Sequence, residues 1–518
     1  MISWTLASRI RRRIEEEEGT LRKSAALRVA LCCPSPYAVG MSSLGFQAIY
    51  GEIHRHENAT AERAFLPDRI DDYRSTRTPL FSYESETPLA EFPVLAFSIS
   101  YELELPGVLE MLALSGIPVL RSERGNRHPL VLAGGPLTYS NPAPLAPFVD
   151  LVILGEAEEL IHPFLDAAGS MPRDALLDHW ASHPGCYLPG RSAGLPPIAV
   201  AGDHCLPARS QIITPNTVLS SMFLIEPERG CSRGCAYCVM RRTTNGGMRT
   251  VAPERVLSMI PAGARRVGLV GAAVTDHPRI SEIVRGIVDA GREIGISSLR
   301  ADRLDEEFVE LLARGGYQTL TIASDGASQR LRDQIGRRTG EQHLIRAAEL
   351  AARFRLRRLK VYELIGLPQE TEADVDELIR FARGLARIVP VSLSISPFVA
   401  KRHTPLDGAA FEPLASLKAK LARLRAGLKG SAEVRSTSVR WSWVQYMLSQ
   451  GGEAAGLAAM DAWRAGGSYQ AWKRAFRERD AHPYALGRKA GPEKKPGTGC
   501  CSDTPAAVHG PVRSEPRS

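Results

Sequence analysis

Apolar and polar positions alternate in two ways along the middle of the chain, from about residue 219 to 405. Short apolar runs predict six strands, at 220–225, 266–271, 294–299, 319–323, 359–365 and 391–396. Between them, apolar residues recur at helical spacing, and the clearest set is Ile280, Ile283, Val284, Ile287 and Val288. Strands that alternate with helices form a parallel sheet with the helices outside it, because each connection must return over the sheet. We predict a partial (β/α)6 barrel of the TIM type for residues 219–410.

A second alternating region comes earlier in the chain. Its pattern predicts a helix at 44–53 and strands at 27–31, 94–98, 130–133 and 151–154. These elements predict a Rossmann-like domain over residues 26–165, preceded by an N-terminal extension at 1–25. Residues 166–218 contain several glycines and prolines and are predicted to be a linker. The chain is therefore expected to be an α/β protein.

A small helical region is predicted at the C-terminal side, at residues 411–485, from leucines at heptad-like spacing: Leu414, Leu417, Leu421, Leu424 and Leu428. Aromatic residues stand among arginines there, namely Trp443, Tyr446, Trp463, Tyr469 and Trp472. They indicate either a surface that stacks on nucleic-acid bases or, more commonly, a helical packing face, which we favour. Residues 486–518 are rich in Gly, Pro, Ser and charge and are predicted to be disordered. Cys500 and Cys501 in this tail are interpreted as reactive thiols rather than as a metal pair.

Composition narrows the class of protein. With 518 residues and 44% apolar residues, the chain can bury the cores of two or three domains. Its net charge of +8 is spread along the chain, so a nucleic-acid partner is compatible but unsupported. No apolar run reaches the ~20 residues that span a bilayer, and the start lacks the apolar core of a signal peptide. Nine cysteines in so long a chain form no disulfide framework. We expect a reduced, cytoplasmic protein without membrane contact.

Three cysteines, Cys231, Cys235 and Cys238, are grouped in the sequence. A closed zinc or iron–sulfur site needs four protein ligands, and no fourth cysteine or histidine lies nearby in the sequence. Three thiolates on one loop can hold three corners of a 4Fe–4S cluster and leave one iron open to a small molecule. The alternative is a zinc loop completed by a distant residue such as Cys205.

The spacing Cys-x3-Cys-x-aromatic-Cys resembles that of the radical S-adenosylmethionine (SAM) superfamily. The resemblance implies that the three cysteines bind a 4Fe–4S cluster whose open iron chelates SAM, and that Tyr237 lies against the adenine. It also implies SAM-binding positions at the ends of successive strands: Gly271, Ala272, Arg300, Asp325 and Gly366. Strand ends are where parallel sheets hold their sites.

Two of these positions carry charge. Arg300 is expected to pair with the SAM carboxylate through both guanidinium arms, and the alternative is that it neutralises Asp302 or Asp305. Asp325 stands where relatives often have glutamate, and the alternative is that it caps a helix. Taken together, their placement at successive strand ends favours the SAM site.

The remaining predicted positions, Gly271, Ala272 and Gly366, are expected to contact SAM through backbone atoms. Relatives carry a Gly-Gly-Glu turn that holds the SAM amino group, and this chain has Gly271 and Ala272 there without the glutamate. Only backbone contacts are therefore expected at this turn. Gly366 begins a segment that resembles the superfamily's Gly-Leu-Pro-x-Glu-Thr turn, whose backbone faces the adenine in relatives.

The first domain carries a resemblance of its own. Residues 132–136 and 150–156 resemble the cobalamin-binding domain that precedes many radical SAM cores. Together with 35–42 and 396–405, they make residues 26–410 resemble one family of radical SAM proteins with such a domain. Cobalamin is therefore an expected third cofactor.

The chain departs from the cobalamin pattern at one position. Domains that hold cobalt through a histidine carry Asp-x-His-x-x-Gly after the first strand, and Tyr37 stands in the place of that histidine. Cobalamin is expected to bind near Tyr37 with no protein ligand to cobalt and with its tail threaded past Gly134 and Gly135. The alternative is a nucleotide-fold domain kept for architecture or substrate contact.

The resemblance implies a function. A radical SAM enzyme cleaves SAM to a 5′-deoxyadenosyl radical, with an electron from a donor such as flavodoxin or ferredoxin. Cobalamin-dependent C-methylation of an unknown substrate is the leading expectation. The alternatives are a SAM-only radical modification of RNA, protein or a metabolite, and a non-catalytic iron–sulfur or cobalamin sensor. The substrate depends on loops at the site and not on the fold.

Overall fold

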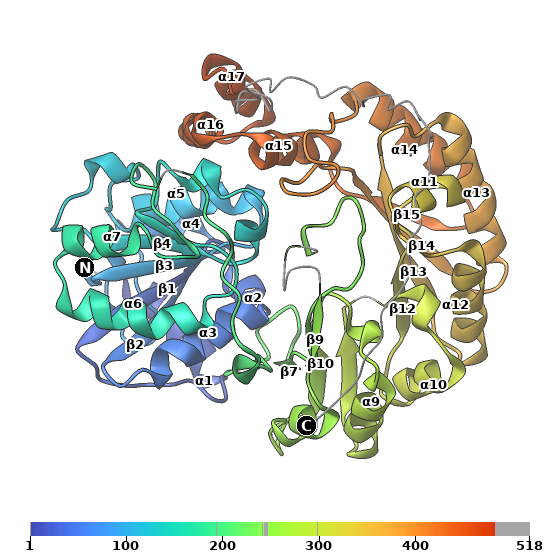
Figure 1. Cartoon of the computed structure of the whole chain (residues 1–518), viewed down its shortest axis with the longest axis horizontal. Helices are drawn as coiled ribbons and strands as arrows, with labels where there is room; N and C mark the ends of the chain where they lie inside the picture. Colours follow the sequence, from blue (N-terminus) through green and yellow to red (C-terminus); the bar gives the residue numbers. More distant parts are fainter. Residues whose placement is uncertain (1, 193, 241, 243–246, 298, 482–518) are drawn as a thin grey trace, which may run out of the picture. The chain divides into compact units, whose positions relative to one another are not determined.

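The computed structural model describes residues 2–192, 194–240, 242, 247–297 and 299–481 (Figure 1). The predicted tail at 486–518, with Cys500 and Cys501, lies outside the described residues. No helix within the described part of the chain combines the length and apolar character that crossing a bilayer requires.

Six strands form the sheet of the first domain: β1 (Leu27–Cys33), β2 (Ala59–Phe65), β3 (Val94–Ser98), β4 (Leu130–Gly134), β5 (Leu151–Ile153) and β6 (Cys186–Tyr187). Their order is β2-β1-β3-β4-β5-β6, and β6 runs antiparallel to β5 while the others are parallel. The order 2-1-3-4-5 is that of flavodoxin-like doubly wound sheets, so the predicted Rossmann-like class is confirmed. Such sheets bind ligands at a switch point, which lies here between β1 and β3.

Seven helices accompany these strands: α1 (Trp4–Glu15), α2 (Tyr37–Gly40), α3 (Leu44–Arg55), α4 (Ile70–Ser75), α5 (Leu105–Leu114), α6 (Glu158–Ser170) and α7 (Arg173–Trp180). Figure 1 shows α3 and α6 side by side on one face of the sheet and α5 on the other. The predicted linker at 166–218 contains α7 and β6, so part of it belongs to the layers of the first domain.

The sequence pattern missed β2, which pairs in parallel with β1. This strand contains Glu62 and Arg63, which are polar and yet buried. Arg63 is fully buried and donates to Glu17 and Glu84 over 2.6–2.8 Å. Because charge pairing rather than apolar packing buries these residues, the strand shows no apolar run.

Seven parallel strands form the second sheet: β7 (Met222–Ile225), β10 (Arg266–Leu269), β11 (Glu293–Ile296), β12 (Thr319–Ala323), β13 (Arg358–Ile365), β14 (Val391–Pro397) and β15 (Glu433–Ser436). They pair as β11-β10-β7 and β12-β13-β14-β15, and a parallel bridge between Leu299 and Ile322 links the two groups. All six predicted strands are present, so the predicted partial barrel is confirmed. The additional strand, β15, contains a single apolar residue, Val434, and could not be recognised as an apolar run.

Helices cover the outside of this barrel: α8 (Pro253–Ser258), α9 (Ile280–Asp289), α10 (Glu306–Arg314), α11 (Gln329–Gln334), α12 (Glu341–Arg353), α13 (Glu372–Ala386) and α14 (Leu414–Leu428). A short antiparallel hairpin, β8 (Glu228–Gly230) with β9 (Met248–Thr250), follows β7. The segment between the two strands of this hairpin holds the grouped cysteines.

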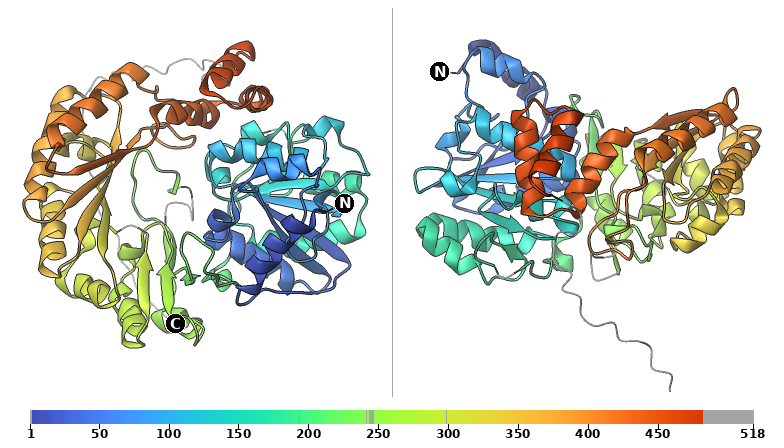
Figure 2. Two further views of the ribbon diagram at one scale, coloured as in Figure 1. Left: turned by 180° about the vertical axis from the view of Figure 1, so that it is seen from behind. Right: turned by 90° about the horizontal axis from the view of Figure 1, so that it is seen from above.

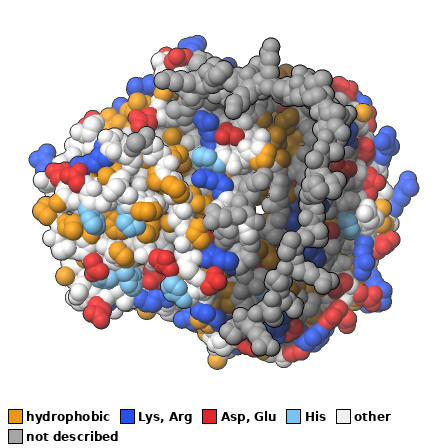
Figure 3. Space-filling model, in the orientation of Figure 1, with side chains coloured by type: hydrophobic (Ala, Val, Ile, Leu, Met, Phe, Trp, Pro, Cys, Tyr) orange, Lys and Arg blue, Asp and Glu red, His pale blue; other side chains and the backbone are white. Residues whose placement is uncertain are grey.

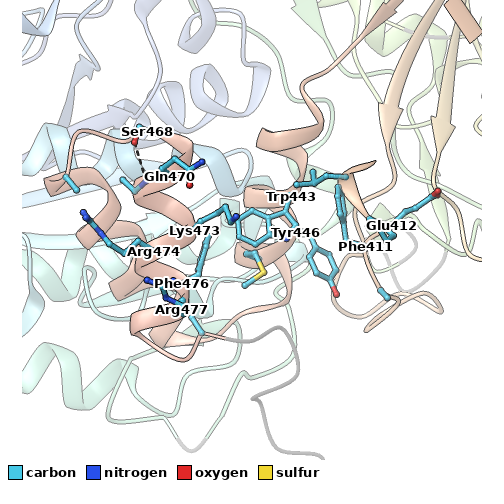
Figure 4. A pocket seen from close by; sticks show the side chains of 17 residues that line it. Phe411, Glu412, Trp443, Tyr446, Ser468, Gln470, Lys473, Arg474, Phe476 and Arg477 are labelled. Carbon is cyan, nitrogen blue, oxygen red and sulfur yellow. Dashed lines mark hydrogen bonds between the residues drawn. The ribbon is translucent and has the colours of Figure 1, made fainter. Parts of the chain in front are cut away.

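The predicted helical region contains α15 (Val439–Gln450), α16 (Glu453–Arg464) and α17 (Tyr469–Glu478). Its aromatic residues pack inward: Trp472 is 2% exposed, and the rings of Trp443 and Phe476 meet edge to face at 5.7 Å. The packing interpretation is therefore confirmed for these rings. A cavity of about 1220 Å³ lies beside α17, and Phe411 and Lys473 are among the residues that line it (Figure 4).

The C-terminal helices contact the first domain, as both views in Figure 2 also indicate. Buried Glu102 bonds to Lys401 at 2.6 Å and to Gln445 at 2.9 Å. The amide nitrogen of Asn141 donates to three carbonyl oxygens at the end of α15, those of Leu448, Ser449 and Gly451, over 2.7–3.1 Å. The first domain is thus bonded to elements that follow the barrel.

Charged side chains of both signs are interspersed on the face drawn in Figure 3, outside the residues shown in grey. Many arginines pair with carboxylates on neighbouring turns or helices, such as Arg423 with Asp376 and Arg479 with Asp461. Such pairs neutralise these arginines locally.

Candidate active site

The cysteine loop follows β8, and its three thiols lie near enough for their charges to act on one another. Cys235 is buried, and Cys231 and Cys238 are partly buried. Burial raises the pKa of the Cys231 thiol, and the neighbouring thiol of Cys235 raises it further. Burial also raises the pKa of Cys238 to about 11, again with contributions from the other two thiols. Three thiols that influence each other on one buried loop fit a cationic iron–sulfur cluster, which takes thiolate ligands.

Tyr237 and Asp325, both predicted from the sequence, meet in the structure. The Tyr237 hydroxyl donates to Asp325 Oδ2 at 2.7 Å, and Arg337 Nε lies 3.0 Å from the same oxygen. Burial, and then the Asp325 charge, raise the pKa of Tyr237 well above its usual range. Asp325 has φ of +61°, in the left-handed region where non-glycine residues store strain and often mark functional sites.

Arg300 lies close to the cysteine loop, and its guanidinium is already paired. Its Nη2 contacts both oxygens of Asp302 at 2.8 and 2.9 Å, and its Nε lies 3.2 Å from Asp276 Oδ1. The Nε contact is an ion pair without hydrogen-bond geometry. The positive charge of Arg300 lowers the pKa of Cys231. The alternative noted from the sequence, pairing with Asp302, is therefore present, while Asp305 instead caps α10 by accepting from the Phe308 amide.

Glu228 is a residue that the sequence reasoning did not single out. It is fully buried, and its Oε1 accepts a hydrogen bond from the Ala273 amide at 2.7 Å. Its Oε2 has no hydrogen-bond partner among the described residues. Burial raises the pKa of Glu228 to about 7, against the opposing effect of the Ala273 amide. The available signal in the sequence was a carboxylate three residues before the first cysteine.

Gly271 is required because of Glu228. A Cβ atom at Gly271 would lie 2.1 Å from Glu228 Oε1. The turn at Gly271 and Ala272, predicted to face SAM with its backbone, therefore carries a carboxylate after all, supplied by β8. Gly366, at the end of β13, has φ of +81°, and its amide donates to Glu370 at 3.0 Å.

A cavity of about 510 Å³ extends from the first domain to this turn. Its lining comes from β1 and β3 on both sides of the switch point, from α3 and α6, and from the strand ends of the barrel. Polar residues in the lining include Glu156, Glu158, Glu226, Glu228 and Arg229, and backbone is exposed at Gly134, Gly135, Gly155, Gly271 and Ala272. Gly135 has φ of +95°, and a Cβ there would lie 2.8 Å from the Ile99 carbonyl oxygen. Gly134 and Gly135 of the first domain and Gly271 of the barrel thus border one cavity.

Tyr37 does not reach this cavity. It is 1% exposed, its ring stacks on Tyr83 at 5.4 Å, and its hydroxyl donates to Glu17 at 2.6 Å. Burial, and then the charge of Glu17, raise the pKa of Tyr37 far above its usual range. Although the sequence placed Tyr37 among the cofactor-binding residues, it belongs to the buried network that neutralises Arg63.

Comparison with known families agrees with this site. Residues 225–382 match the radical SAM superfamily, and residues 45–189 match the N-terminal domain of radical SAM proteins. The chain belongs to the radical SAM superfamily. It is an enzyme of the class that uses a 4Fe–4S cluster and SAM.

Several proteins are similar to the chain. The uncharacterized protein MJ0966 of Methanocaldococcus jannaschii is 25% identical over 416 residues, which cover 77% of this chain and 83% of that protein. The ribosomal protein uS12 methylthiotransferase RimO of Desulfosudis oleivorans is 27% identical over 221 residues, or 39% of this chain and 46% of that protein. An uncharacterized methyltransferase of Pyrococcus horikoshii, PH0819, is 26% identical over 169 residues, or 31% of this chain and 37% of that protein. The chain thus spans less than half of these last two relatives.

Among solved structures, the cobalamin-dependent SAM radical enzyme OxsB with aqua-cobalamin bound is 13% identical, with a TM-score of 0.48. The match covers 69% of this chain and 52% of that chain.

Proposed function

We propose that this radical SAM enzyme also binds cobalamin and methylates a carbon atom of its substrate. The observation that carries the proposal is the apolar cavity of about 510 Å³, which is lined by the switch point of the first domain and by the Gly271 turn of the barrel. A switch point is where doubly wound sheets hold nucleotide-like ligands. The cavity gives a ligand of the first domain access to the SAM side of the barrel.

The residues of the chain have separate tasks in this proposal. Cys231, Cys235 and Cys238 hold the cluster, and Arg300 with the Gly271 turn orients the methionine part of SAM. When bound, the cluster and SAM supply a 5′-deoxyadenosyl radical, and cobalamin supplies the methyl group. The bond from Tyr237 to Asp325 fixes the tyrosine ring, which can then lie flat against the adenine.

The first domain would hold cobalamin by shape and backbone. Gly134 and Gly135 allow close approach at the end of β4, and apolar side chains of α3 and α6 line the rest of the cavity. No histidine of the described residues lines it. Cobalamin is therefore expected to bind with no protein ligand to cobalt, which makes the cobalt easier to reduce.

The proposal also needs an external electron donor, because no described residue of the chain can reduce the cluster. A small reduced protein such as flavodoxin or ferredoxin fits this requirement.

Gly134→Leu tests the proposal. The nearest atom to a Cβ at Gly134 is the Ile153 carbonyl oxygen at 3.8 Å, so a side chain fits locally and its end fills the cavity. After anaerobic reconstitution, this variant should retain no more than about one tenth of the cobalamin that the parent protein retains. Reductive cleavage of SAM should continue. Gly169→Leu is the control, because Gly169 is exposed on α6 with no atom near its Cβ position.

The products separate the two enzymatic functions. Methylation should yield S-adenosylhomocysteine together with 5′-deoxyadenosine, and formation of both should depend on bound cobalamin, whereas a SAM-only rearrangement yields no S-adenosylhomocysteine. If the parent protein retains no cobalamin under reducing, anaerobic conditions, the methylation proposal is wrong and the SAM-only function remains.

A further inference from the structure

A second group of metal-binding side chains lies outside the candidate active site. It borders a cavity of about 690 Å³ that is lined by α3, by the start of α6 and by residues 204–211. We propose that Glu159, His204 and Cys205 bind a zinc-type divalent cation there. The proposal does not depend on the reaction that the cluster performs.

The donor atoms are already close to coordination distance. One ligand atom from each of Glu159, His204 and Cys205 lies within 4.8 Å of the others, and His204 Nε2 is 3.5 Å from Glu159 Oε1. In a tetrahedral zinc site, bonds of 2.0–2.3 Å place ligand atoms roughly 3.4–3.8 Å apart. Small side-chain movements therefore suffice to close the site around an ion.

Gly202 provides an independent observation. Its amide donates to Glu159 Oε1 at 3.0 Å, which holds that carboxylate in place. A Cβ atom at Gly202 would lie 2.7 Å from His204 Nδ1 and 2.9 Å from Glu159 Oε1. A side chain at Gly202 would make the exposed imidazole and carboxylate shift, whereas glycine lets them approach each other. This matches the outer contacts that orient the ligands of metal sites.

The set of donors indicates the kind of ion. One thiolate, one imidazole and one carboxylate suit zinc and exclude a preference for magnesium or calcium, which take oxygen ligands. Three protein ligands leave the fourth position to water. The group is separate from the cluster cysteines, and Cys205 therefore does not serve as the distant fourth ligand considered from the sequence.

The surrounding charges favour a cation as well. Three carboxylates, those of Glu52, Glu158 and Glu159, line the same cavity as Cys205. Of the nearby cations, Arg55 pairs with Glu52 and Arg255 donates to the His204 carbonyl oxygen. A bound cation would offset the negative charge, and the Cys205 thiol would release its proton to the solvent on binding.

Such an ion would have a structural consequence. Glu159 belongs to the first turn of α6, whereas His204 and Cys205 belong to the segment that leads to the barrel. The ion would fasten this segment to the first domain, and it would raise the melting temperature by an amount that grows with the logarithm of its free concentration above the dissociation constant.

Cobalt titration tests the proposal in the full chain. The background protein carries alanine at Cys231, Cys235, Cys238, Cys500 and Cys501, so that neither the cluster loop nor the tail contributes thiols. After treatment with a chelator, this protein should bind one Co²⁺ per chain with tetrahedral d–d bands and a thiolate charge-transfer band, and it should release one proton. Added Zn²⁺ should displace the bound Co²⁺, and these absorption bands should disappear.

Variants decide whether the named residues are the ligands. Cys205→Ala should abolish the charge-transfer band, His204→Gln should weaken binding by more than about tenfold, and Gly202→Ala should weaken it by about 10–100-fold. Cys186→Ala and His183→Ala are the matched controls and should bind as the background protein does. The metal-free melting temperature of Cys205→Ala should equal that of the background protein, which separates loss of binding from misfolding. Binding that is unchanged in Cys205→Ala, or the lack of stoichiometric binding at micromolar Co²⁺, would overturn the proposal.

Discussion

At the carboxyl ends of the first domain's strands, glycines and apolar side chains surround a single buried carboxylate after β5, that of Glu156, whereas the strand ends of the barrel carry several buried charges. Gly134 and Gly135 border an apolar cavity in the first domain. In the barrel, Arg300 and Asp325 stand beside three thiols, within networks of ion pairs. A large ligand can be held by shape at the first edge. A small, charged and reactive ligand requires the oriented charges of the second.

The first prediction, with the largest expected effect, concerns the charged edge. Changing Cys231, Cys235 and Cys238 together to alanine should remove the iron–sulfur absorbance and all reductive SAM cleavage, because no other described cysteines are grouped beside this site. Absorption spectra and 5′-deoxyadenosine formation after anaerobic reconstitution measure the effect. Cys186→Ala, a buried cysteine of β6, should keep both. Absorbance that persists in the triple variant would place the cluster elsewhere.

The second prediction asks whether the arginine at this edge has a specific role. Arg300→Lys should raise the dissociation constant of SAM about tenfold, or roughly 1.4 kcal/mol, because lysine lacks the planar fork. Arg303→Lys is the control, since Arg303 contacts the same Asp276 from a half-exposed position. The cluster should survive in both variants. Equal effects of the two substitutions would make Arg300 a structural partner of the aspartates.

The third prediction concerns Glu228, a barrel residue that lines the cavity shared with the first domain. Its pKa is raised to about 7, so the unfolded chain loses this proton at a lower pH than the folded protein does. Stability should fall between about pH 4.5 and 7 and level off above that window. The free energy of unfolding of Glu228→Gln, measured relative to that of the parent, should therefore rise by up to about 3 kcal/mol from pH 5 to pH 8.

Urea unfolding of the cluster-free protein at both pH values provides the measurement. Glu57→Gln, at an exposed position, is the control and should differ from the parent equally at the two pH values. A difference for Glu228→Gln that does not change with pH would show that the buried carboxyl titrates normally.

The fourth prediction concerns Tyr37, which is buried in the first domain away from the cavity. Tyr37→Phe removes the hydrogen bond to Glu17 and should cost about 1–2 kcal/mol of unfolding free energy. The spectrum of any bound cobalamin should stay unchanged, because the hydroxyl points into the protein. Tyr101→Phe, at a residue that is 45% exposed, should change stability by less than about 0.5 kcal/mol. A spectral change in Tyr37→Phe would return this residue to the cofactor site.

The sequence allowed most of both sheets to be predicted, and the exceptions have a common physical cause. Strands buried by apolar packing, such as β10 and β14, appear as apolar runs. In β2, Arg63 is buried by ion pairs with Glu17 and Glu84, which come from distant parts of the chain. Partners that are brought together only by folding leave no local pattern.

The same reason explains the outcome at the candidate site. Cys231, Tyr237 and Asp325 could be placed because motif spacing and strand ends are local properties. The carboxylate at the Gly271 turn could not, since Glu228 reaches it from β8, more than forty residues earlier. Tyr37 was placed by spacing alone, and its bond to Glu17 depends on the fold of the N-terminal segment.

The bonds from Glu102 and Asn141 to the C-terminal elements have a consequence for how the chain is made. Both side chains are 3% exposed, and their partners Lys401, Gln445 and the end of α15 are synthesised some three hundred residues later. During synthesis, the first domain could form its sheet before the residues that bond to Glu102 and Asn141 have been made. A fragment cut before the barrel would carry the same unpaired groups for good. When the two parts of this enzyme are expressed separately, each should therefore aggregate or require chaperones. Co-expression of both parts should prevent this.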